Sequence, residues 1–168
     1  MTRGELTDCY RRFYRPLGMY ALKLLGDVDE AEDIVQEIFG TLVDRSDDIS
    51  SATVKPYLYR AVHNRVLNRL RDNMGERLAE YPDEVTEEDI DTSERDARLW
   101  EEIGQLPQRC REVFLMAKRD GMSYAEIAEE LGISVKTVEN QMTKALSRLR
   151  EALSARKGRK VFFLPFLV

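Results

Sequence analysis

Side chains that bind nucleic acids recur at helical spacing between residues 134 and 150. Asn and Gln side chains can each form a two-pronged pair with adenine, and Lys or Arg can pair with guanine or with phosphate. Ser134 and the free amide groups of a helix start favour a phosphate. If the apolar positions of this stretch face a core, the outward face consists of Thr137, Gln141, Lys144 and Arg148, with Lys136, Asn140 and Ser147 beside them.

The residues around this stretch predict the elements of a helix-turn-helix. Ser123 and Glu126 form a capping box for a short helix over residues 123–131, Gly132 makes the turn, and Ser134 caps the last helix. In such a motif the second helix presents its N-terminal turns to the major groove. A basic helix face alone is usually only solvated. Here the caps, the turn and the charge agree, so we interpret this stretch as DNA-binding.

A second basic stretch, KPYLYRAVHNRVLNRLRD, predicts a helix from residues 55 to 72. Tyr57 and Tyr59 near its start could stack on unpaired bases, while arginines track phosphates. Taken alone, the pattern fits equally well a helix with tyrosines in the core and arginines in water. His63 is expected to be a polar surface residue or a support for a neighbour, not a catalyst. The polar stripe consists of Arg60, Asn64, Asn68 and Arg71.

Charge is distributed unevenly along a chain whose net charge is −5. Residues 55–77 carry 6 basic and 2 acidic groups, and residues 103–168 carry 12 and 7. Between them, residues 78–102 carry 2 basic and 11 acidic groups, a net of −9. Two basic blocks separated by an acidic one predict two places at which the chain meets nucleic acid.

Other protein classes lack support in the sequence. The N-terminus has no apolar signal-peptide core, and no run approaches the roughly 20 apolar residues of a membrane span, so we expect a cytoplasmic protein without membrane insertion. Cys9 and Cys110 stand far apart at apolar helical positions, which indicates small buried residues rather than a disulfide. One histidine and no CxxC make a zinc site improbable, and no cofactor is expected.

Periodicity predicts an all-α fold with two small helical domains joined by an acidic flexible linker. Three helices are expected in residues 4–73, the second opened by Asp27 and carrying a stripe that includes Val43. Residues 74–93 read as the linker. A further helix capped by Ser93 begins the second domain, residues 94–155, and a basic and hydrophobic tail follows at 156–168.

Three quoted stretches together resemble one family. FYRPLGMYALKLLGDVDEAEDIVQEIFGTLV, then PYLYRAVHNRVLNRLR, then LPQRCREVFLMAKRDGMSYAEIAEELGISVKTVENQMTKALSRLREAL, are similar in order to regions 2 and 4 of bacterial extracytoplasmic-function sigma factors. These are the small sigma-70 family factors that keep only those two regions. The pattern GDVDEAEDIVQEIF is highly specific for region 2. The resemblance implies a non-enzymatic subunit that binds core RNA polymerase and promoter DNA, and it implies an anti-sigma factor as a further partner.

The resemblance also implies roles for residues. The −10 element is expected to meet Asn64, with Arg60, Asn68 and the loop 45–53 holding a flipped base, and Tyr57 and Arg71 complete this predicted site. The −35 element is expected to meet Ser134, Lys136, Thr137, Asn140, Gln141, Lys144 and Arg148. The helix that docks on core polymerase is expected to use Asp33, Gln36, Glu37 and Phe39.

Two other functions remain open from the residues. A regulator with a LuxR-type DNA-binding domain would share IAEELGISVKTVEN almost as well, with residues 1–93 as its sensor. An enzyme is the weakest alternative. The carboxylates of Glu32, Asp33 and Glu37 form a cluster, but no nucleophile, metal set or phosphate loop accompanies them.

Overall fold

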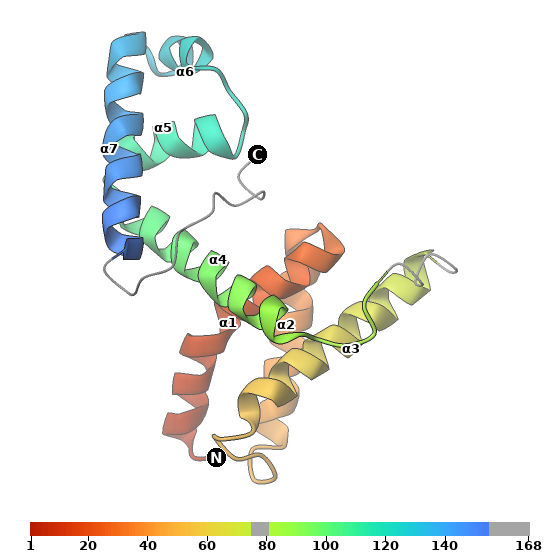
Figure 1. Ribbon diagram of the computed structural model, residues 1–168. Helices are drawn as coiled ribbons and strands as arrows, with labels where there is room; N and C mark the ends of the chain where they lie inside the picture. The colour runs from red at the N-terminus through yellow and green to blue at the C-terminus, as the bar shows by residue number, and fades with distance from the viewer. Residues whose placement is uncertain (75–80, 155–168) are drawn as a thin grey trace. The chain divides into compact units, whose positions relative to one another are not determined.

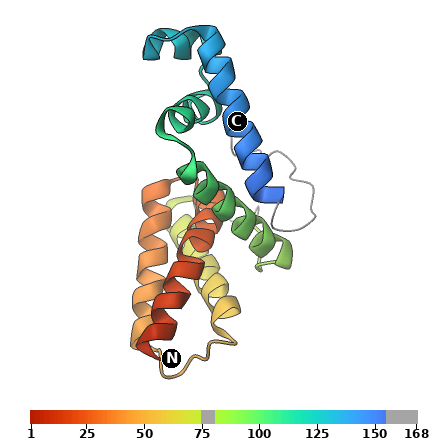
Figure 2. The same cartoon turned by 90° about the vertical axis from the view of Figure 1, so that its left-hand side faces the viewer.

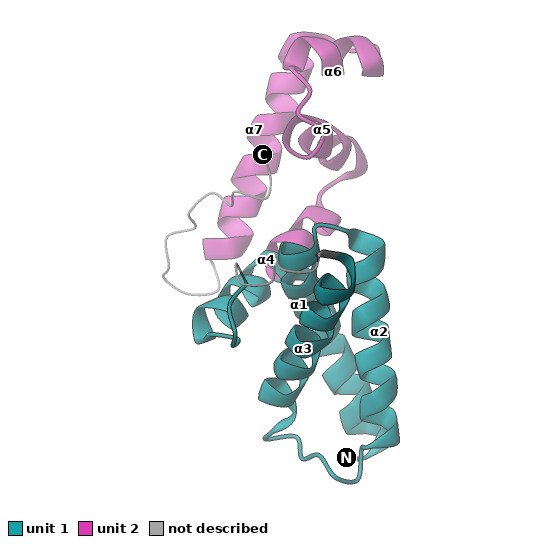
Figure 3. Cartoon of the chain, turned by 90° about the vertical axis from the view of Figure 1, so that its right-hand side faces the viewer, with its two compact units in different colours: residues 1–97 teal, residues 98–168 magenta. Residues whose placement is uncertain are grey.

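The computed structural model describes residues 1–74 and 81–154, and helices are the only regular elements in these ranges. They form two compact units, residues 1–97 and residues 98–168 (Figure 3). The boundary between the units falls within one helix, α4. The predicted tail, residues 156–168, lies outside the described residues. None of the helices in the described part of the chain has the length and apolar content of a membrane span.

The first unit is built on a bundle of three helices, α1 (Arg3–Leu25), α2 (Val28–Asp44) and α3 (Val54–Met74) (Figures 1 and 2). Gly26 ends α1 in the left-handed conformation at φ 71°, and Asp27 caps α2 by accepting from the amide of Glu30, both as predicted. Val43, however, is 57% exposed, because it lies in the last turn of α2 beyond the reach of the core.

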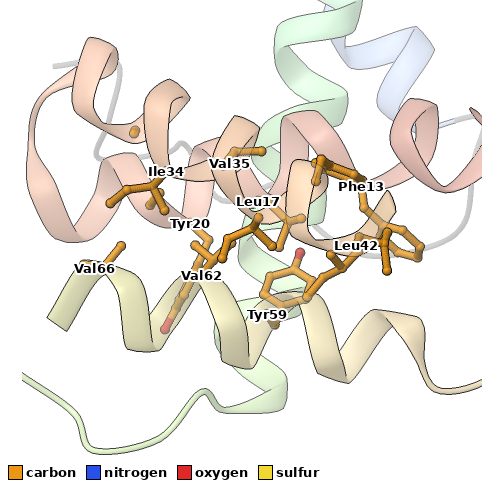
Figure 4. Close-up of a cluster of buried hydrophobic side chains, with 14 of the residues drawn as sticks. Phe13, Leu17, Tyr20, Ile34, Val35, Leu42, Tyr59, Val62 and Val66 are labelled. Atoms are coloured by element: carbon orange, nitrogen blue, oxygen red, sulfur yellow. The ribbon is translucent and has the colours of Figure 1, made fainter. Parts of the chain in front are cut away.

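Each of the three helices contributes one apolar stripe to the core of the first unit (Figure 4). Within each stripe the apolar residues recur every three or four positions, and this spacing makes each helix amphipathic. Cys9 is part of this core, as predicted. The labelled core residues are Phe13, Leu17 and Tyr20 of α1, Ile34, Val35 and Leu42 of α2, and Tyr59, Val62 and Val66 of α3.

The fourth helix begins earlier than predicted. Thr86 and Asp89 form a capping box, in which Asp89 N–H donates to the Thr86 hydroxyl at 3.1 Å and Thr86 N–H donates to the carboxylate at 3.0 Å. The helix α4 (Glu87–Gln105) therefore includes residues assigned to the linker. Ser93, predicted as the cap, lies buried inside α4, where its hydroxyl donates to the carbonyl of Ile90. The prediction of Ser93 as a cap was wrong.

The second unit contains the rest of α4 with α5 (Gln108–Lys118), α6 (Tyr124–Leu131) and α7 (Val135–Ser154). Its core combines Leu99 and Ile103 of α4 with Phe114 of α5 and Ile127 of α6. Cys110 is buried in it, as predicted. The stripe of α7 that faces this core consists of Val138, Met142, Ala145 and Leu149.

Candidate nucleic-acid interface

The helices α6 and α7 meet at a tight turn whose residues satisfy the free backbone groups on both sides. Ser123 and Glu126 form the predicted capping box of α6, and this contact holds the pKa of the Glu126 carboxyl below its usual value. Gly132 ends α6 in the left-handed conformation at φ 63°. Thr137 N–H then donates to the hydroxyl of Ser134 at 3.1 Å, which caps α7. The predicted helix-turn-helix is therefore present.

The side of α7 away from its core carries most of the predicted DNA-contacting residues. Val138 and Met142 face inward, so residues offset from them around the helix are turned to solvent. Thr137 and Gln141 are half-buried because they lie closer to the core stripe. The exposed members of the predicted set are Ser134, Lys136, Asn140, Lys144 and Arg148.

Two members of this set have partners that shape the surface. Lys136 Nζ lies 3.3 Å from a carboxylate oxygen of Glu139, but its side chain is 78% exposed and keeps access to a phosphate. The backbone carbonyl of Gln141 accepts from the thiol of Cys110 at 3.4 Å, which ties this turn of α7 to α5. Gln141 is thereby held in position at the start of the exposed face.

The C-terminal half of α7 has cations near a buried thiol and a shallow groove. Burial raises the pKa of the Cys110 thiol, while the charges of Arg148 and Lys144 act in the opposite direction. Arg148 also lines a groove whose other walls include Glu102, Gln105 and Glu151. Arg148 and Lys144 are both exposed, so both cations can reach DNA.

The predicted polar stripe of α3 is exposed on the first unit. Arg60, Asn64, Asn68 and Arg71 all reach solvent, and a guanidinium nitrogen of Arg71 lies 3.4 Å from the amide oxygen of Asn68. Tyr57 is half-buried against the core at the start of the helix. The stripe thus presents donors and amides along one helix face, as backbone tracking and base contact require.

For two residues of α3 the structure decides between the alternatives that the sequence left open, and both are buried. Tyr59 is only 1% exposed and its hydroxyl lies 2.6 Å from that of Ser93, so it cannot stack on a base. His63 is 2% exposed, not at the surface, and its Nδ1 lies 2.7 Å from the hydroxyl of Tyr20. Both positions follow Leu58 and Val62 on the inward side of the helix, a periodicity that the sequence contains.

The predicted polymerase-binding residues of α2 divide into surface and core. Asp33, Gln36 and Glu37 are exposed. Phe39 is 7% exposed, and its ring centroid lies 5.0 Å from that of Tyr10 in an edge-on arrangement. Phe39 therefore packs α2 on α1 and is not a surface contact, because it shares the inward stripe with Val35.

Further residues beside these surfaces were not predicted as parts of a site. Tyr10 is 46% exposed, and its ring centroid lies 4.7 Å from that of Tyr14 in a tilted arrangement. The Tyr14 hydroxyl accepts a hydrogen bond from the side-chain amide of Gln36 at 3.4 Å. Arg65 of α3 pairs with Glu37 at 2.8 Å. Tyr10 and Tyr14 are four residues apart on α1, and this spacing could have indicated that the two rings lie together on one face of the helix.

Within residues 1–74 and 81–154, no group of three or more His, Cys, Asp or Glu side chains is arranged to hold a metal ion. The exposed groups are donors, amides and carboxylates suited to binding.

Comparison with known proteins gives matches to two family models. The model described as sigma-70 region 2 matches residues 9–75, and the model described as sigma-70, region 4 matches residues 96–149. The two matches follow the order of the two units, and each contains one of the predicted DNA-contacting helices.

Similar full-length relatives carry related names. The RNA polymerase sigma factor SigZ of Bacillus subtilis is 23% identical over 154 residues, covering 89% of this chain and 87% of the relative. The ECF RNA polymerase sigma factor RpoE of Cereibacter sphaeroides is 25% identical over 158 residues, covering 90% and 87%. A solved structure, the sigma factor RpoE in complex with the anti-sigma factor NepR from Bartonella quintana, matches with 19% identity and a TM-score of 0.37, covering 90% of this chain and 98% of that one.

Proposed function

Because the chain belongs to the extracytoplasmic-function group of the sigma-70 family of bacterial sigma factors, we propose how its residues direct promoter-specific initiation. A sigma factor is not an enzyme. It binds core RNA polymerase, recognises a promoter, and leaves the chemistry of RNA synthesis to the polymerase. The observation that carries the assignment is the presence of both regions, in order, on one chain, each with an exposed polar helix face.

The −35 element is assigned to α7. Asn140 and Gln141 lie in its N-terminal half, where a recognition helix reaches base edges, and their amides suit adenine. Lys144 lies one turn further on, where a cation neutralises phosphate. Ser134, Lys136 and Thr137 at the start of α7 position the helix through the phosphate backbone. Arg148 adds charge at the far end.

The −10 element is assigned to α3. Asn64 lies on the exposed stripe between Arg60 and Asn68, one turn from each, so the three side chains form a continuous polar surface for an unpaired strand. Tyr57 is half-buried at the start of the helix, and its backbone N–H donates to the carbonyl of Thr53 at the end of the loop 45–53. Arg71 extends the positive surface toward the end of α3.

The binding of core RNA polymerase is assigned to the exposed face of α2. Asp33 and Gln36 lie on that face next to Glu37, while Ile34 and Leu42 pack inward. We propose a cytoplasmic site of action, where RNA polymerase transcribes, with an anti-sigma factor as a third partner.

The decisive experiment is run-off transcription by bacterial core polymerase with and without the purified chain. The template is a pool of promoters with randomised −35 and −10 elements, and the transcribed molecules are sequenced. Protein-dependent transcripts enriched for defined bases at both elements are expected. Binding of duplex DNA without capture of core polymerase and without transcription would instead indicate a stand-alone regulator with a helix-turn-helix.

A further inference from the structure

A pocket on the first unit joins the predicted −10 face to an acidic segment. It has a volume of about 500 Å³. One wall is α3 and the other is the chain that leads into α4, which runs back along α3 in Figure 1. We call residues 81–94 the acidic strap, since they contain seven acidic and no basic side chains. The pocket is lined by Pro56, Tyr59, Arg60, His63 and Asn64 of α3, and by Asp83, Glu84, Val85 and Ile90 of the strap.

His63 leaves an unsatisfied polar atom at this pocket. Its Nδ1 is engaged by Tyr20, but Nε2 is buried and has no hydrogen-bond partner among the described residues. Leaving a buried polar group unpaired is costly, so such a group in a folded protein calls for an explanation. His63 lines the pocket together with Asn64 of α3 and with residues of the strap, and the strap offers Nε2 no hydrogen-bond partner.

Several contacts hold the strap on the helices below it. The hydroxyls of Ser93 and Tyr59 lie 2.6 Å apart, and Lys55 of α3 pairs with Glu94. A carboxylate oxygen of Asp89 lies 3.4 Å from Nζ of Lys23 on α1. Partial burial acts to raise the pKa of Asp89, but hydrogen bonds from Thr86 and the contact with Lys23 outweigh it and lower that pKa. The apolar part of the attachment is partial, with half-buried Tyr81, Val85 and Ile90 packed on the core.

We propose that the acidic strap, which lies beside the exposed −10-reading face of α3, competes there with a DNA strand in the free chain and is displaced when the strand binds. This inference rests on the proposed assignment of Arg60 and Asn64 to the −10 element. Asp83 and Glu84 line the same pocket as Arg60 and Asn64, so their negative charge lies beside the residues assigned to the strand. The strap thereby places charge of the same sign as DNA beside the site, and a strand must compete with it.

The strength of the attachment fits a displaceable strap. Its ion pairs join partly exposed side chains, which are individually weak, and its hydrogen bond between Tyr59 and Ser93 is a single neutral contact. A strap held in this way stays beside the site in the free chain and yields to a strand presented by the polymerase. Displacement also frees Nε2 of His63 to meet water or a base.

The first test measures DNA binding by the full-length chain without polymerase. The probe is a fluorescent pool of short single strands of random sequence, followed by anisotropy. Asp83→Asn with Glu84→Gln is expected to tighten binding about fivefold, because the strap no longer competes electrostatically. The matched control is Glu87→Gln with Glu88→Gln, which changes net charge equally in the same segment at residues that do not line the pocket. Equal tightening by both pairs would show an effect of net charge alone and would overturn the proposal.

The second test follows the strap without DNA. His63 is the single histidine of the chain, so its carbethoxylation by diethyl pyrocarbonate, located by peptide mass mapping, reports access to Nε2. Ser93→Ala removes the hydroxyl that faces Tyr59 and is expected to raise the modification rate about fivefold at unchanged helical content. A rate equal to that of the wild type, together with unchanged strand binding, would contradict a displaceable strap.

Run-off transcription separates this proposal from the function on which it rests. Strap variants are expected to support run-off as well as the wild type, because the holoenzyme holds the strand in place of the strap. If the wild type directs transcription but the strap variants change neither strand binding nor His63 modification, only the strap proposal fails. If the wild type directs no transcription, the proposed function fails, whatever the modification rates show.

Discussion

A carboxylate oxygen of Glu37 on α2 lies 2.8 Å from the guanidinium of Arg65 on α3, and Arg69 approaches the other oxygen at 3.9 Å. Glu37 therefore ties two helices of the first unit together in addition to being exposed for a partner. The Glu37 and Arg65 side chains are 44% and 49% exposed, so the pair is expected to contribute only about 0–1 kcal/mol to stability. A charge reversal at Glu37 would place a cation beside two arginines and destabilise the packing of α2 on α3. A loss of polymerase binding in that variant could then result from the altered fold.

Asp33 and Glu37 are expected to bind core polymerase. The ion pair between Glu37 and Arg65 determines which substitutions can test this. Asp33→Lys with Glu37→Gln is expected to abolish capture of core polymerase, because it removes both carboxylates without placing a cation beside Arg65. Helical content is expected to stay unchanged. Pull-down of purified core polymerase measures the binding, and circular dichroism measures the fold.

The control for this experiment is Asp8→Lys on α1, an exposed carboxylate outside the proposed surface. It is expected to retain core binding. Retained capture by the Asp33 and Glu37 variant would remove the exposed face of α2 from the interface.

The −35 assignments separate residues that position α7 from residues that read bases. Lys144→Ala is expected to weaken binding to all −35 sequences about equally and to reduce the salt slope by about 1. Arg148→Ala is expected to act in the same way, because Arg148 is also an exposed cation on α7. Asn140→Ala is expected to change base preference, at about 1–3 kcal/mol for a lost pairing.

These three variants are compared on a randomised −35 library in the holoenzyme at several salt concentrations. If Asn140→Ala lowered the affinity for every sequence alike, the base-reading assignment would be wrong. A changed melting temperature in all three variants would indicate that the face supports the fold instead.

Asn64 is expected to act on the −10 element after the closed complex has formed. Asn64→Ala is expected to impair promoter opening more than initial binding, because the proposed target is an unstacked base. Permanganate footprinting of unpaired thymines measures opening, and a gel shift measures the closed complex. A pre-melted template is expected to restore opening but not base preference, and wild-type preference at every −10 position would contradict the assignment.

The sequence predicted most of this architecture because its signals are local. Gly26, Asp27, Ser123, Gly132 and Ser134 act within one turn of their own position, and each ends or begins a helix as predicted. The prediction of Ser93 as a helix cap failed because two capping patterns compete in this segment, Thr86 with Asp89 and Ser93 with Asp96. The choice between them depends on Tyr59, whose hydroxyl is 34 residues away along the chain and holds Ser93 inside the helix.

The sequence indicated the residue types of the predicted site more reliably than it indicated which of these residues are exposed. Amides and cations on α3 and α7 were identified by periodicity. Phe39 and His63 lie on the inward side of their helices, as the periodicity indicates, but their individual partners, Tyr10 and Tyr20 of α1, are tertiary contacts that no local pattern contains. The acidic segment was recognised as a charge block, but its position against Arg60 and Asn64 depends on tertiary packing.

The turn between α6 and α7 is expected to require glycine for its backbone conformation and not for space. Gly132 has φ 63°, and a Cβ there would meet nothing within 4 Å. Gly132→Ala is therefore expected to destabilise the second unit by about 1 kcal/mol through the left-handed conformation alone. Gly18→Ala, inside α1 and equally free of contacts, is expected to stabilise by about 0.5–1 kcal/mol. Urea unfolding compares both with the wild type, and a loss of stability at both positions would contradict this explanation.

Tyr59 is expected to make the first unit sensitive to alkaline pH. Burial raises its pKa from the ordinary value of 10.0 to about 12, although the hydrogen bond with Ser93 acts in the opposite direction. Burial raises the pKa of Tyr20 as well. Between pH 10 and 12 the unfolded chain loses these protons while the folded chain keeps them. The unfolded state then binds fewer protons, so the free energy of unfolding falls as pH rises through this window.

Tyr59→Phe is expected to make that fall shallower, because one of the ionising groups is gone. At pH 7 the variant is expected to be less stable by about 1 kcal/mol, since the hydroxyl contact with Ser93 is lost. Urea unfolding at about pH 7, 10 and 11, followed by circular dichroism, measures both effects. Tyr124→Phe is the matched control, because Tyr124 is 39% exposed at the start of α6 and its hydroxyl is not buried in a core. An identical alkaline slope for the wild type and Tyr59→Phe would show that Tyr59 ionises equally easily in both states, and the buried contact between α3 and α4 would lose its support.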